Sequence, residues 1–101
     1  MVRGTTPTVT LTIPGVSLKQ MKSIYVTIQQ YSIKLTKKNG DPSLVIGDST
    51  IEVHLSQEET LSFKSGIAEI QVRCLTQGGK AFATNICTVE VKSVLLEEVI
   101  A

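Results

Sequence analysis

His54 is the only histidine in the chain, so any nucleophile activated by a histidine base would have to be built around it. A general base works in a cleft, within reach of a nucleophile and an orienting group. Apolar Ile51, Val53 and Leu55 alternate with polar Glu52 and His54, which predicts that His54 faces solvent from a strand. We therefore expect a protein that is not an enzyme and has no catalytic residues.

Cys74 and Cys87 are the only cysteines and could form a disulfide, hold a metal or remain free. A two-residue turn at Gly78–Gly79 would place Cys74 opposite Ala83 and Cys87 opposite Ile70. The two thiols would then lie roughly 14 Å apart along the strand, beyond the ~7 Å between Cα atoms that a disulfide allows. Two thiols and one histidine also lack the pattern of a zinc site. We expect two buried, unbridged thiols, with no metal and no cofactor.

The charges are few and mixed, with a net charge of +1. The densest basic groups, Lys37–Lys38 and the pair Lys19 and Lys22, form no stripe that could neutralise several phosphates, so we expect solvated lysines and no nucleic-acid partner. None of the nine carboxylates has the apolar setting of a catalytic acid, and no glycine-rich phosphate loop precedes a helix, so no small-molecule substrate is expected. No apolar run approaches the ~20 residues of a membrane span. Met1–Gly15 lacks the apolar core of a signal peptide, so we expect synthesis in the bacterial cytoplasm.

A period of two dominates the chain and predicts strands with one buried face. Valine, isoleucine and threonine are abundant, whereas aromatic residues make up 4% of the chain. The predicted strands are Pro7–Ile13, Ser23–Gln29, Ile33–Thr36, Leu44–Ile46, Thr50–Ser56, Ile67–Thr76 and Ala81–Lys92. Their spacing is typical of an all-β sandwich of about seven antiparallel strands, which we place at residues 1–93 as one domain.

Two capping boxes predict short helical turns, a weak one at Ser17–Gln20 and a better one at Ser56–Glu59. After the second, Leu61 and Phe63 should pack beneath the turn, and Gly66 should end it. The phase of alternation slips between Ile28 and Ile33, which a tight hairpin around Gln30–Ser32 or a bulge would explain. A further bulge is expected near Thr84–Asn85, where Phe82 and Ile86 fall out of phase with Cys87, Val89 and Val91.

Two surfaces are candidates for binding a partner. Residues 94–101 carry an apolar set beyond the last strand, which either folds back on the domain or docks on another subunit. Its apolar members are Val94, Leu95, Leu96, Val99 and Ile100. The second surface is the threonine face of the first strand, which either pairs with a neighbour or is an ordinary polar outer face. Its members are Thr8, Thr10 and Thr12.

Several short motifs resemble small prophage proteins of gut Firmicutes. They are Arg3–Thr8, Leu55–Leu61, Ile70–Arg73, Gly79–Ala81 and Ala83–Ile86. More loosely, the chain resembles the N-terminal domain of phage baseplate upper proteins, an immunoglobulin-like module that ties receptor-binding machinery to the tail. The resemblance implies an immunoglobulin-like sandwich with a structural role and no catalytic residues.

Taken together, these features predict a phage or prophage virion structural or assembly protein that binds other phage structural proteins. We expect a homo-oligomer that leaves the cytoplasm in the virion. The alternative is a free-standing sandwich that binds a glycan or host surface. That class of protein usually presents exposed aromatic side chains, and only Tyr25 and Tyr31 are candidates here.

Overall fold

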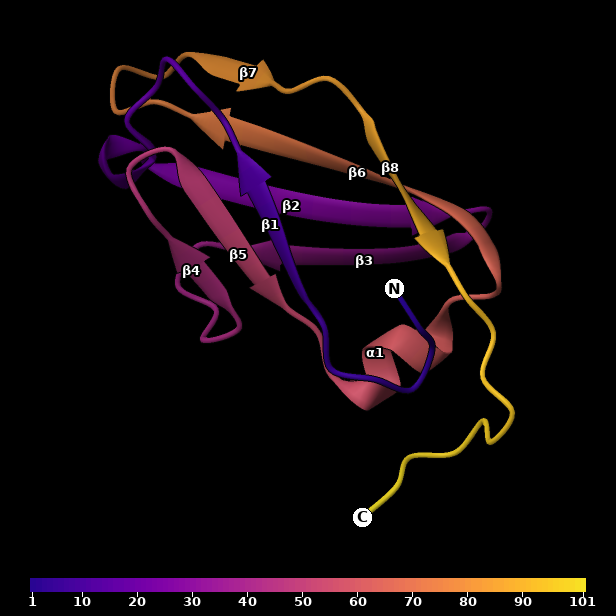
Figure 1. The fold of residues 1–101 in the computed structure, drawn as a ribbon. Coiled ribbons are helices and arrows are strands. Elements are labelled where there is room, and N and C mark those ends of the chain that lie inside the picture. Colours follow the sequence, from indigo (N-terminus) through magenta and orange to yellow (C-terminus); the bar gives the residue numbers. More distant parts are fainter.

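Two antiparallel sheets pack face to face in the computed structural model, which describes residues 1–101 (Figure 1). The smaller sheet has the order β1-β5-β4, and the larger has the order β3-β2-β6, with β7 and β8 both paired to the other side of β6. The strands are β1 (Thr8–Thr12), β2 (Ser23–Gln30), β3 (Ile33–Lys38), β4 (Leu44–Ile46), β5 (Thr50–His54), β6 (Gly66–Leu75), β7 (Ala81–Ala83) and β8 (Cys87–Val91). The predicted all-β sandwich is therefore confirmed, with eight strands where about seven were expected.

The core lies between the sheets and follows the alternation of the sequence. Every second residue of β2 and β6 is buried, as is every second residue of β5, because successive side chains of a strand point to opposite faces. The buried apolar residues are Leu18, Ile24, Val26, Ile28, Leu44, Ile51, Val53, Leu55, Phe63, Ala68, Ile70, Val72, Cys74 and Val91. The inward residues predicted for these three strands are confirmed.

The hairpin between β2 and β3 explains the slip of phase in this part of the sequence. Gln30 pairs with Ile33, so Tyr31 and Ser32 form a two-residue loop, and Tyr31 has a φ of 54°. A positive φ in the first loop residue is typical of the tight turns that match strand twist. As a consequence Ile33, Leu35 and Lys37 all point inward.

The loop between β6 and β7 is one residue longer than predicted. Leu75 pairs with Ala81 and Cys74 with Phe82, so Cys74 does not face Ala83. The Thr76 amide donates to the Lys80 carbonyl at 2.8 Å, which closes a three-residue loop, and Gly79 has a φ of 87°. Three-residue hairpin loops place a residue of positive φ at this position, and glycine adopts it without steric cost.

A bulge follows and shifts the register back by one residue. β7 and β8 are separated by Thr84–Ile86, which confirms the predicted bulge and divides the expected last strand into two. Beyond it Cys87 pairs with Ile70, as predicted. Both cysteines are free, also as predicted, but only Cys74 is buried; Cys87 is exposed, which corrects the expectation of two buried thiols.

The two helical turns form, although only one has its predicted cap. α1 (Gln57–Ser62) begins at Ser56 with a complete capping box, whereas the 3₁₀ turn at Leu18–Gln20 has no side-chain bond from Ser17. Phe63 is fully buried as expected, but the buried residue of α1 is Thr60, and Leu61 is only partly buried. Neither helical segment is long and apolar enough to cross a membrane.

The neighbours of each strand can be compared with those of the immunoglobulin fold. In that fold one sheet has the order A-B-E-D, and the other has the order C-F-G, which variable domains extend by C′ beside C. Here β1-β5-β4 has the neighbours of B-E-D, and β3-β2-β6-β8 has those of C′-C-F-G, but no strand lies beside β1 in the place of A (Figure 1). The sandwich is thus confirmed, whereas its immunoglobulin-like identity is not.

Candidate functional site

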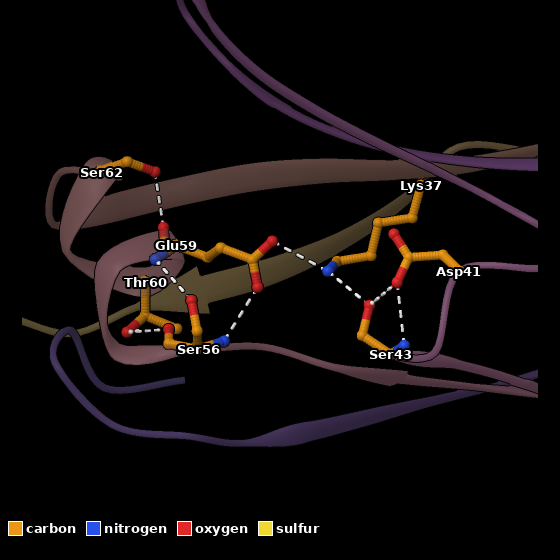
Figure 2. A network of polar contacts seen from close by, with 7 residues as sticks. All are labelled: Lys37, Asp41, Ser43, Ser56, Glu59, Thr60 and Ser62. Atoms are coloured by element: carbon orange, nitrogen blue, oxygen red, sulfur yellow. Dashed lines mark hydrogen bonds and ion pairs between the residues drawn. The ribbon is translucent and has the colours of Figure 1, made fainter.

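A buried ion pair joins β3 to α1 at one end of the sandwich. Lys37 Nζ lies 2.8 Å from Glu59 Oε2 and donates a hydrogen bond to Ser43 Oγ at 2.6 Å (Figure 2). The side chain of Lys37 is 7% exposed and that of Glu59 24%. This finding corrects the expectation that Lys37 is solvated, whereas Lys19, Lys22 and Lys38 are exposed as expected.

Each partner of Lys37 is held by a second hydrogen bond. Glu59 Oε1 accepts from the Ser56 amide at 2.9 Å, which is half of the capping box, and Ser43 Oγ donates to Asp41 Oδ1 at 2.7 Å (Figure 2). Burial by itself would raise the pKa of Glu59, but the hydrogen bonds from Lys37 and Ser56 and the charge of Lys37 outweigh it, and the pKa is lowered. Hydrogen bonds from the amide and hydroxyl of Ser43 lower the pKa of Asp41.

Two neutral side chains complete the polar contacts around α1. Gln30, buried at the end of β2, donates to the Lys64 carbonyl at 2.6 Å and accepts from the Lys64 amide at 2.7 Å. Thr60 Oγ1 accepts from the Gly4 amide and donates to the Thr5 carbonyl, each at 2.9 Å. The chain before β1 and the chain after α1 are therefore both bound to this end of the sandwich.

Arg3 links α1 to the segment 94–101. Its Nε donates to the Phe63 carbonyl at 2.6 Å and its Nη2 to the Leu61 carbonyl at 2.9 Å, so the guanidinium satisfies carbonyls at the end of the helix. Its Nη1 forms an ion pair with Glu97. Planar geometry with several fixed donors makes arginine suited to such a three-way contact.

The segment 94–101 is bound to α1 and Arg3 through polar groups, while most of its apolar side chains are exposed. Gln57 donates to the Ile100 carbonyl at 3.1 Å and accepts from the Ile100 amide at 2.8 Å, which adds to the ion pair of Glu97. Leu95 is fully exposed, and Leu96, Val99 and Ile100 are 55%, 49% and 62% exposed. Of the predicted interface residues only Val94 is partly buried, near Gly4 and Leu61. The segment is neither helix nor strand.

The other predicted interface residues lie on β1, and all three are exposed. Thr8, Thr10 and Thr12 face solvent from the smaller sheet, and β1 is the edge strand of that sheet. His54 is exposed as predicted, and its Nδ1 lies 3.0 Å from Thr8 Oγ1. No group of three or more histidine, cysteine or acidic residues could hold a metal ion.

The outer face of the larger sheet carries a cluster of polar side chains around an exposed tyrosine. Tyr25 is 40% exposed, pairs across the strands with Arg73, and has Lys38 Nζ 5.6 Å from its ring centre. Neither cation belongs to an ion pair of the chain. A hollow of about 420 Å³ beside them is lined partly by the hydroxyls of Ser23, Thr27 and Thr36.

Comparison with known proteins gives no relative for this arrangement: no family model, no curated protein and no solved structure matches the chain. Three surfaces of the domain present groups that a partner could contact. One surface presents apolar side chains, one presents a free strand edge, and one presents two unpaired cations beside a tyrosine.

The ion pair at α1 predicts a defined dependence of stability on pH. The pKa of Glu59 in the folded state lies below the ordinary 4.5. Ionised Glu59 therefore stabilises the fold above pH 4.5, and this stabilisation is lost as the pH falls through the pKa of the folded state. Glu59→Gln keeps an acceptor for Ser56 but leaves Lys37 without its counter-ion, and should lower the free energy of unfolding by about 1–3 kcal/mol at pH 7. Urea denaturation between pH 7 and pH 3 should show this difference shrinking as the pH falls. Glu58→Gln, at an exposed neighbouring position, is the control, and a difference that does not change with pH would contradict the prediction.

The contacts of Arg3 predict that it orders the segment 94–101. Arg3→Lys keeps the positive charge but cannot bind two carbonyls and Glu97 together, so the Ile100 amide should exchange its hydrogen faster and stability should fall by about 1–2 kcal/mol. Hydrogen exchange measured by NMR tests the first effect directly. Arg73→Lys, on the outer sheet face, should change neither quantity. Unchanged protection of Ile100 in Arg3→Lys would show that Gln57 holds the segment alone.

Proposed function

We propose that this protein is a structural or assembly module of a phage or prophage particle, and that it docks on other virion proteins through residues 94–101. The observation that carries the proposal is the orientation of this segment. Its polar groups are bound to Arg3 and Gln57, while Leu95, Leu96 and Ile100 remain exposed.

A segment held in this way is suited to binding another protein. Burial of a leucine or isoleucine side chain is worth about 1.5–3 kcal/mol relative to leaving it exposed. Ordering a flexible segment normally opposes association, and a backbone already fixed by an ion pair and two amide bonds reduces that cost. Clustered exposed apolar side chains are also typical of interaction sites.

The assignment to a phage particle depends on the sequence resemblance to prophage proteins and to the baseplate upper proteins. The all-β sandwich is compatible with such a module, and its strand order matches the immunoglobulin pattern apart from the first strand, which is absent. In this proposal the protein is synthesised in the bacterial cytoplasm and then joins the virion, without catalytic activity or cofactor.

The proposal predicts that the chain is a component of purified particles. After induction of a lysogen that encodes it, mass spectrometry should find the chain at a constant ratio to the tail proteins. The double variant Leu95→Ser/Leu96→Ser should fold, because neither side chain is in the core, but should be missing from particles. The double variant Val45→Ser/Ile86→Ser removes exposed apolar side chains elsewhere and should be incorporated normally. Particles that lack the wild-type chain would refute the proposal.

A second candidate function is binding of an acidic glycan on the outer face of the larger sheet. Tyr25 offers an aromatic surface with a polar end, and Arg73 can bind a carboxylate through two parallel hydrogen bonds. The hollow beside them has hydroxyl groups but no carboxylate among its lining residues.

This candidate predicts binding to glycans that carry a carboxylate, measured on a glycan array. Tyr25→Ala and Arg73→Ala should each abolish the signal, because stacking and charge recognition act on the same ligand. Tyr31→Ala is the control, since Tyr31 is an exposed tyrosine in the β2–β3 loop. An array without any specific signal would remove this candidate.

A further inference from the structure

The free edge of β1 differs from every other sheet edge in the molecule. Exposed edges are normally protected by charge, by shortness, by a bulge or by a covering segment. β3 carries three lysines, β4 has three residues, and the edge of β7 and β8 is interrupted by the bulge at Thr84–Ile86. β8 is covered further by Met1–Arg3, which bond to Glu90 and Lys92. β1 has five uncharged residues, without a proline or a bulge among them.

The backbone groups of β1 that face this edge belong to its three threonines. The Pro7 carbonyl accepts from Leu55, and the Ile13 amide donates to Ser49 at 2.7 Å, so the odd-numbered residues bond to β5. Bonded and outward-facing residues alternate in an antiparallel pair. The amides and carbonyls of Thr8, Thr10 and Thr12 therefore point away from β5, toward the free edge.

An apolar groove runs beside the same edge. It has a volume of about 380 Å³ and lies between β1 and the strands β6 and β8 of the opposite sheet. Its apolar lining includes Leu11, Ile13, Ile70, Val72 and Val89, and no charged residue lines it. At this seam the two sheets do not close over the core, so an added strand would meet both hydrogen-bonding groups and apolar surface.

We propose that β1 pairs with β1 of a second copy of this chain, antiparallel and about a two-fold axis at Thr10. Thr10 then faces Thr10 of the second copy, and Thr8 faces Thr12, so all outward amides and carbonyls of both strands are paired. The two smaller sheets become one continuous sheet, and the two grooves meet at the axis. An interface of this kind is self-complementary, as a two-fold dimer requires.

The absence of charge on β1 favours a second copy over segment 94–101 as the occupant. The segment carries Glu97 and Glu98, which have no cation to meet in the groove. Threonine, in contrast, pairs favourably with threonine across strands. The molecule already contains directly opposed threonines at Thr12 and Thr50 of β1 and β5 and at Thr27 and Thr36 of β2 and β3, and in the second pair the two Oγ1 atoms lie 3.2 Å apart.

Sedimentation equilibrium of the full chain tests this inference, with concentrations from about 1 μM to about 1 mM to cover weak interfaces. The wild-type chain should form a dimer. Thr10→Pro removes one outward amide and no bond to β5, and should raise the dissociation constant at least about tenfold. Thr10→Val keeps the backbone donor and should remain a dimer. Circular dichroism establishes that both variants are folded.

A pair of charge variants tests the register independently. In Thr8→Lys/Thr12→Lys every inter-chain pair of these residues has like charges, so the dimer should dissociate at low salt. In Thr8→Glu/Thr12→Lys each pair has opposite charges, so the dimer should return although the same two positions are changed. Equal behaviour of the two variants, or a wild-type chain that is monomeric throughout, would overturn the inference.

The inference deepens the proposed assembly role by giving the expected homo-oligomer an interface, but it depends on β1 alone. The variant Leu95→Ser/Leu96→Ser separates the two proposals. It should remain a dimer while losing its place in the particle. Loss of the dimer in this variant would assign self-association to residues 94–101 and overturn pairing through β1.

Discussion

The architecture depends on satisfying the polar groups buried around α1. The three buried polar side chains of the protein are Gln30, Lys37 and Thr60, and each bonds to α1 or to the chain next to it. An unpaired polar group in this setting would cost more than a typical hydrogen bond contributes. No buried polar side-chain atom lacks a partner. α1 can therefore cover one end of the sandwich although Leu61 is its only apolar residue, and Gln57 of α1 binds the segment 94–101.

The alternation of apolar and polar residues made the sandwich predictable. The same alternation also indicated that Lys37 points inward, which was not predicted. Inward residues of β2, β5 and β6 follow directly from the sequence because burial selects apolar residues at every second position. Lys37 stands in the same phase as Ile33 and Leu35, but its charge and its neighbour Lys38 favoured a solvated side chain. Only tertiary structure brings Glu59 and Ser43 to it, from α1 and from the turn before β4. A lysine at an inward-facing position of a strand therefore predicts an acidic partner buried beside it.

The register of the last strands shows why loop lengths are harder to derive. Gly78–Gly79 fits a two-residue loop, yet the hydroxyl of Thr76 accepts from the Lys80 amide and supports a three-residue one. The bulge after β7 then restores the register that a two-residue loop would have given. For this reason the prediction that Cys87 faces Ile70 is confirmed, whereas the prediction that Cys74 faces Ala83 is wrong. Local competition between turn types, decided by single hydrogen bonds, is not visible in hydrophobic periodicity.

The candidate surfaces were only partly predictable because their shape depends on contacts between residues far apart in the sequence. Composition identifies residues 94–101 and the threonines of β1, but not the polar contacts by which Arg3 and Gln57 turn the apolar side chains of the segment outward. These contacts join residues more than forty positions apart in sequence. If β1 pairs about a two-fold axis, each dimer presents two such segments. Under the proposed assembly role the two segments would be linked docking sites, and binding of the first would raise the effective concentration of the second, so that individually weak contacts would suffice for stable attachment.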